Sequence, residues 1–139
     1  MANLKALSLY QPWASLIMAG RKTIETRSWA TKYRGPLAIH ASKARINADA
    51  AAQFYPLLAK RYYPQKLLKM RFSTGAVLGI VILKGCVQFP NALAPPDEYG
   101  DFTEGRFGWL LMNVEKFETP IPAKGHLGLW NWIQEGEPR

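Results

Sequence analysis

The sequence predicts an α+β fold, a small mixed or antiparallel β-barrel of about six strands that is flanked by helices. The apolar segments are short and interrupted by glycine, which is typical of barrels built from short strands. Helical patterns occur only in a short stretch near the start and in one Ala-rich stretch before the middle of the chain. With 139 residues, 48% of them apolar and 20% charged, the composition is that of one globular domain with a substantial core.

The first 42 residues are predicted to hold a helix between strands. Pro12 suits the first position of the helix, and Gly20 ends it. The segments around the helix alternate in polarity with a period of two, as strands do. These strands cover residues 4–9, 22–29 and 36–42, with a polar loop over 30–35.

Residues 46–72 are predicted to form a helical insertion between strands. Asn47 suits the N-cap of an Ala-rich helix over 48–55. Pro56 ends or kinks this helix, and a second helical piece is expected over about 57–63.

The second half of the chain is predicted to be mostly strand. Residues 75–83 form an apolar run that predicts a buried strand, and Gly85 predicts a bulge before 86–89. Residues 90–106 are rich in Pro, Asp and Glu, which predicts a variable surface loop. The remainder is expected to hold a strand over 107–114, a connection bracketed by Pro120 and Pro122, a closing segment over 124–132 and a frayed end over 135–139.

The net charge of +8 favours a polyanionic partner. The charge is unevenly distributed, since residues 1–74 hold 13 Lys or Arg and 2 acidic residues, whereas residues 75–139 hold 5 and 8. Cys86 is the only cysteine, which excludes an internal disulfide and a zinc site built on cysteines. No segment approaches transmembrane length, and Gln11-Pro12 interrupts the apolar start early, so we expect a cytoplasmic protein with no membrane partner.

The segment 20–29 is the most informative part of the sequence. It combines three cations, one carboxylate and one indole in ten residues. With a period of two, Thr23, Glu25, Arg27 and Trp29 share one face of the predicted strand. Such a face suits the wall of a polar pocket that receives a planar, anionic ligand such as a nucleotide.

Four ordered segments resemble the activating-signal-cointegrator homology (ASCH) domain family. Residues 7–17 resemble its opening, and residues 20–27 match its G-x-K-x-x-E-x-R signature at every fixed position. Residues 34–42 and 122–130 match two further segments. The resemblance extends over about residues 4–132, and we expect residues 1–139 to form one ASCH domain with 46–72 and 90–106 as its variable parts.

The resemblance implies a barrel related to the PUA RNA-binding fold and a role in RNA metabolism. It implies a cleft lined by the signature residues Lys22, Glu25 and Arg27. Related proteins include acetylcytidine amidohydrolases, and nuclease activity has been proposed for some members. The amidohydrolases place a threonine three residues after the signature lysine, where this chain has Glu25, so a ribonuclease is favoured over an amidohydrolase if the protein is an enzyme.

Each signature residue has a chemical role and a simpler alternative. Lys22 and Arg27 would supply positive charge to a phosphate or a base edge, and Glu25 would accept from the amino group of cytosine or guanine. The alternative is an ion pair that serves only structure. Further binding candidates, from the basic strip and the loops around it, are Arg34, Ser42, Lys43, Arg45 and Lys124.

The five tryptophans fall into two groups. Trp13 and Trp29 are candidate platforms for base stacking, which is worth about 1–3 kcal/mol per base. Trp13 could instead plug one end of the barrel. Trp109, Trp130 and Trp132 are predicted to belong to the core.

Three functions remain open from the sequence. The first is an RNA-binding domain that holds a nucleotide or unpaired base of a single-stranded region in the cationic cleft, without a cofactor. The second is a ribonuclease, or a hydrolase of a modified nucleoside, with Lys22, Glu25 and His40 as catalytic candidates. No metal site is predicted, although a nuclease could hold a divalent ion between Glu25 and substrate phosphates. The third is a protein-interaction module that uses the acidic loop 90–106, with partners that the sequence does not name.

Overall fold

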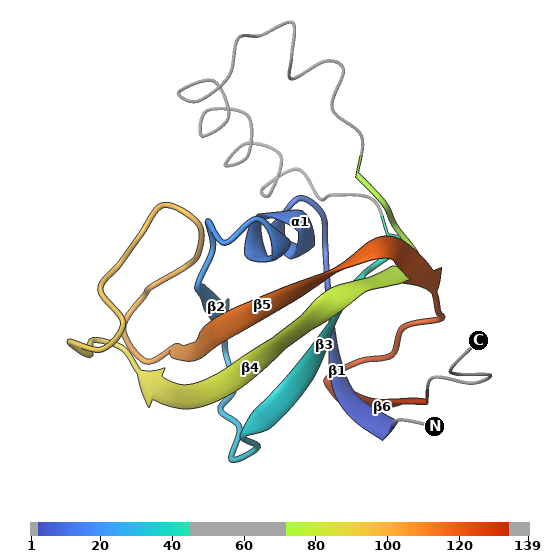
Figure 1. The fold of residues 1–139 in the computed structure, drawn as a ribbon. Helices are drawn as coiled ribbons and strands as arrows, with labels where there is room; N and C mark the ends of the chain where they lie inside the picture. Colours follow the sequence, from blue (N-terminus) through green and yellow to red (C-terminus); the bar gives the residue numbers. More distant parts are fainter. Residues whose placement is uncertain (1–2, 45–71, 134–139) are drawn as a thin grey trace, which may run out of the picture.

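The computed structural model describes residues 3–44 and 72–133. Strands dominate this part of the chain, and one short helix follows the first strand (Figure 1). The elements are β1 (Asn3–Leu9), α1 (Trp13–Met18), β2 (Ile24–Arg27), β3 (Gly35–Ala41), β4 (Ala76–Gln88), β5 (Phe107–Pro122) and β6 (Leu129–Ile133).

The six strands form one strongly curved sheet in the order β2-β5-β4-β3-β1-β6. β1 and β3 are parallel, and every other neighbouring pair is antiparallel. In the described residues β2 and β6 do not pair with each other, so the sheet is a half-barrel. This arrangement confirms the predicted small, mixed barrel of six strands. The predicted helical insertion 46–72 lies outside the described residues, except for Phe72, which is not in a helix.

Two strand lengths differ from the prediction. β2 has four residues rather than spanning 22–29. Before β2, only the Thr23 carbonyl still bonds to β5, through the N–H of Leu111, and after β2 the carbonyl of Trp29 accepts from the Trp109 indole. β5 is longer than predicted and runs through Pro120 and Pro122. β2 pairs with β5 only as far as Leu110. Beyond Leu110, this edge of β5 has no partner strand among the described residues, so it tolerates prolines, which have no N–H to donate.

The predicted segments around Gly85 form one strand, β4, which runs from Ala76 to Gln88. The pairing of β4 with β5 shifts register between Leu83 and Gly85, which confirms the predicted bulge. A Cβ atom at Gly85 would lie 3.1 Å from the Leu110 side chain, so the bulge fits closely against β5.

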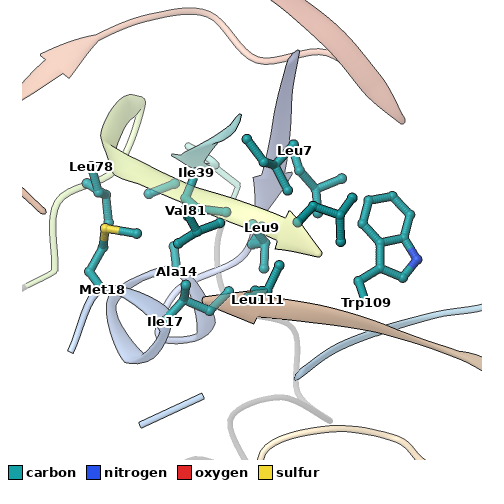
Figure 2. Close-up of a cluster of buried hydrophobic side chains, with 13 residues drawn as sticks. Leu7, Leu9, Ala14, Ile17, Met18, Ile39, Leu78, Val81, Trp109 and Leu111 are labelled. Atoms are coloured by element: carbon teal, nitrogen blue, oxygen red, sulfur yellow. The ribbon is translucent and has the colours of Figure 1, made fainter. Parts of the chain in front are cut away.

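The main core lies between α1 and the sheet. Ala14, Ile17 and Met18 of α1 point at apolar side chains of β4 and β5, and Trp109 closes one end of the cluster with no exposed surface (Figure 2). Trp130 and Trp132 are buried in a second cluster, so all three tryptophans predicted for the core are confirmed there. None of the helices within residues 3–44 and 72–133 is long and apolar enough to cross a membrane.

Candidate functional site

A large open cavity lies where β1, β2 and β3 meet the loop between β5 and β6. Its volume is about 1390 Å³, which exceeds the roughly 300–1,000 Å³ of most small-molecule sites. Seven sequence candidates line it, namely Trp13, Glu25, Arg27, His40, Ser42, Lys43 and Lys124. The curved sheet brings them together: β3 carries His40 beside Ser8 of β1, and Arg27 of the edge strand β2 donates to the Ser8 carbonyl.

Glu25 lies between the two signature cations. Its Oε2 accepts from Nε of Arg27 over 2.8 Å, and its Oε1 lies 3.4 Å from Nζ of Lys22. The carboxylate is almost buried, with 8% of Glu25 exposed, and two cations compensate its desolvation. A carboxylate oxygen has two acceptor sites, so Glu25 keeps capacity for a donor from the cavity side.

Lys22 does not line the cavity, contrary to its expected role as a direct ligand contact. It is 2% exposed, and Nζ donates to the carbonyls of Ile24 over 2.9 Å and Tyr99 over 2.7 Å. These two bonds and the ion pair to Glu25 occupy the donors of an ammonium group. Lys22 therefore positions Glu25 and fastens the 90–106 loop to the start of β2.

Trp13 lines the cavity from the first turn of α1, and its ring centroid lies 5.7 Å from Nζ of Lys22. The indole thus has a cation on one side and the cavity on another. Trp13 therefore borders the cavity and also packs against the main core. It is available for stacking only over the part of the ring that faces the cavity.

A directed hydrogen-bond chain runs along one wall. Nε2 of His40 lies 2.8 Å from the carbonyl of Ala123, which can only accept, so Nε2 carries the proton. Nδ1 of the neutral ring then accepts from the Ser8 hydroxyl over 2.9 Å, and the Ser8 oxygen accepts from Nε1 of Trp130 over 3.1 Å. Burial lowers the pKa of His40, the bond to Ala123 opposes this change, and His126 lowers the pKa further.

Two further sequence candidates, Trp29 and Arg34, lie elsewhere. The ring of Trp29 packs edge-on against Trp109 at a centroid distance of 4.8 Å and does not line the cavity. Arg34 is exposed outside the cavity and donates to the nearby carbonyls of Thr31 and Tyr33. Trp29 was expected to share the strand face of Glu25 and Arg27, but β2 ends at Arg27, two positions before it. Arg45 lies outside the described residues.

The cavity also contains residues that the sequence analysis did not select. Ser8 escaped notice because its neighbour His40 is 32 positions away, and only the parallel pairing of β1 with β3 makes them adjacent. Arg106 reaches the cavity from the end of the 90–106 loop. The other residues missed on the cavity wall include Tyr10, His126 and Leu127.

The cavity surface is cationic. Its lining includes four permanent cations, Arg27, Lys43, Arg106 and Lys124, and a single acidic residue, Glu25. Arg106 also forms an ion pair with Asp101, in which Nε lies 3.4 Å from Oδ2. Hydrogen bonds from Thr103 lower the pKa of Asp101. Within the described ranges, no three His, Cys, Asp or Glu side chains gather as they would around a metal ion.

The model of the ASCH domain family matches residues 7–121 of this chain. Among curated proteins, activating signal cointegrator 1 of Mus musculus is 29% identical over 129 residues, which are 89% of this chain and 21% of that protein. The Homo sapiens protein of the same name is 28% identical with the same coverage. The chain thus spans about a fifth of the length of these curated relatives.

Solved structures of similar fold come from Zymomonas mobilis. The crystal structure of its ASCH protein superimposes with a TM-score of 0.55 and covers 94% of this chain and 87% of that one. A point mutant of that protein gives a TM-score of 0.54 and covers 94% of this chain and 90% of the mutant. Both are 18% identical to this chain, so the likeness concerns the fold alone.

Proposed function

The chain belongs to the ASCH domain family, and we propose that it is an RNA-binding domain whose cavity holds a nucleotide or an unpaired base, with a role in RNA metabolism. One observation supports this proposal most directly. The ion-paired carboxylate of Glu25 and guanidinium of Arg27 lie side by side on the wall of an open, cationic cavity. Together they offer an acceptor and donors to the edge of a base.

The surroundings of this pair suit a nucleic-acid strand. The cavity is larger than a typical small-molecule site, so it has room for more than one nucleotide. Lys43 and Lys124 are exposed at its edge and can approach phosphates, while Trp13 offers part of an aromatic face to a base. An unpaired base fits better than a duplex, because its hydrogen-bonding edge is free to meet Glu25 and Arg27.

The test is an equilibrium titration of a fluorescently labelled single-stranded RNA by fluorescence anisotropy. The wild-type protein is compared with Arg27→Ala and with Arg34→Ala, a second arginine that lies outside the cavity. We expect Arg27→Ala to weaken binding strongly and Arg34→Ala to leave it nearly unchanged. Equal affinity for all three proteins would contradict a role of the cavity, provided that their unfolding temperatures agree.

The Ser8–His40 pair favours a second candidate, cleavage of the bound RNA. Nδ1 of His40 accepts from the Ser8 hydroxyl at the cavity wall, and Nε2 bonds to Ala123, so the imidazole is suited to take a proton from the cavity through Ser8. Glu25 and Lys22 are less suited to this role, since each oxygen of Glu25 faces a cation and Lys22 does not line the cavity. Gel analysis of the same RNA, with and without a chelator, separates the candidates, because shortened products that His40→Gln fails to make would indicate cleavage.

A further inference from the structure

Leu127 is the most exposed large apolar side chain in the described residues. Its relative exposure is 99%, against 70% for Leu93 and less for the others. It lies in the loop between β5 and β6 and lines the cavity of Glu25 and Arg27. An isolated exposed leucine is ordinary in itself, so the argument depends on how its loop is held.

The loop around Leu127 is fixed by contacts on both sides. The carbonyl of Ala123 accepts from His40, and a Cβ atom at Gly125 would lie 2.5 Å from the His40 ring and 2.6 Å from the Ser8 hydroxyl oxygen. The backbone at Gly125 therefore lies directly against β1 and β3. The ring of His126 contacts Trp130 edge-on at a centroid distance of 5.2 Å.

The chain turns immediately after Leu127. Gly128 has a φ of 65°, a conformation that favours glycine, and Leu129 begins β6. Leu127 thus stands at the tip of an anchored loop while its neighbours pack. The backbone of the loop is held by these contacts, and the side chain of Leu127 is exposed because of the conformation that they fix.

We propose that Leu127 is a wedge that takes the place of the base entering the cavity, so that the preferred ligand is an RNA helix with a bulged nucleotide. This inference rests on the RNA-binding function proposed above. An apolar side chain that inserts at a base step replaces stacking contacts that the step loses. A bulged base leaves the stack at the lowest cost, and the wide minor groove of an RNA helix admits a loop tip.

The charges around Leu127 favour a nucleic acid over an apolar protein surface as the occupant. Lys124 lies in the same loop and is exposed, and Lys43 and Arg106 line the same cavity. An apolar side chain on a cavity that cations also line matches the alternation of stacked bases and phosphates along a strand. The wedge and the cations would then contact neighbouring parts of one ligand.

The test compares three RNAs of equal length: a hairpin with one bulged nucleotide, the fully paired hairpin and an unstructured strand. Each is titrated with wild type, Leu127→Ala, Leu127→Phe and the matched control Leu93→Ala, which alters an exposed leucine outside the cavity. We expect wild type to prefer the bulged hairpin. Leu127→Ala should weaken that complex roughly fivefold or more, since it removes apolar surface that the bulge would bury, and change binding of the unstructured strand by less than about twofold. Leu127→Phe and Leu93→Ala should behave like wild type.

Each contrary result has a distinct meaning. If Leu127→Ala binds the bulged hairpin as wild type does, or loses affinity equally for all three RNAs, the wedge is refuted. If wild type binds the unstructured strand in an Arg27-dependent way but does not prefer the bulge, the wedge fails and the RNA-binding function stands. If wild type binds none of the RNAs, both proposals fail. Because Leu127 is exposed, loss of folding is not expected, and the unfolding temperatures of the variants check this.

Discussion

The guanidinium of Arg27 donates from Nε to Oε2 of Glu25 over 2.8 Å and from Nη2 to the carbonyl of Ser8 over 3.0 Å. A single side chain thus links β2 to β1 and holds the carboxylate at the cavity wall. A fork that is fixed before a ligand arrives loses little freedom on binding. This pre-organisation leads to the first prediction.

Arg27→Lys should weaken RNA binding by roughly fivefold to tenfold, because lysine keeps the charge but loses the planar fork that can read a base edge. The dependence of affinity on salt should stay as in wild type, since the number of cations is unchanged. Anisotropy titrations at several salt concentrations measure both quantities. Arg34→Lys is the control outside the cavity, and a weakening of the same size in that variant would contradict the prediction.

The double variant Lys43→Ala and Lys124→Ala should have the opposite signature. Removing two phosphate contacts should reduce the slope of log affinity against log salt by about 1.4 for a single strand. Both side chains are exposed, so stability should change little. The matched control removes the exposed Lys32 and Lys84, which do not line the cavity. An equal reduction of the slope in the control would show that the charge acts without regard to position.

The sequence predicts the sheet better than it predicts the site. Alternation and glycine positions identify six strands because each strand must bury one face, a property that is local in the chain. Glu25 and Arg27 of the signature line the cavity. The direction of a side chain at the end of a strand is not local, however. Trp29 follows β2 by two positions, yet its ring packs edge-on against the buried Trp109.

Lys22 is a second residue whose position the local sequence does not predict. A lysine in a basic cluster suggests an exposed charge, but the carbonyl of Tyr99, 77 positions away, provides a buried partner. The pairing of Ser8 with His40 likewise depends on the crossover between two parallel strands. Contacts of this kind arise from topology, and the residues involved carry no periodic pattern that would indicate them.

Lys22→Met should destabilise the protein by about 3–5 kcal/mol, because it leaves a buried carboxylate and two buried carbonyls without one of their donors. Urea unfolding followed by tryptophan fluorescence gives the free energy. Arg21→Met is the neighbouring control, and because Arg21 is exposed the change should stay within about 0.5 kcal/mol. A loss below about 1 kcal/mol for Lys22→Met would contradict a structural role of the ammonium group.

The stability of the protein should fall as the pH drops below about 6.5, because burial lowers the pKa of His40 in the folded protein below that value. The unfolded chain then binds a proton more readily than the folded one, so the free energy of unfolding is highest above pH 6.5 and decreases until the lower, folded pKa is reached. His40→Gln keeps a donor near the Ala123 carbonyl without a titrating ring, and it should reduce this decrease. Urea unfolding at several pH values between about 5 and about 7.5 measures the decrease. His126→Gln, which removes the exposed histidine, should retain most of it, and an unaltered decrease in His40→Gln would assign the effect to another group.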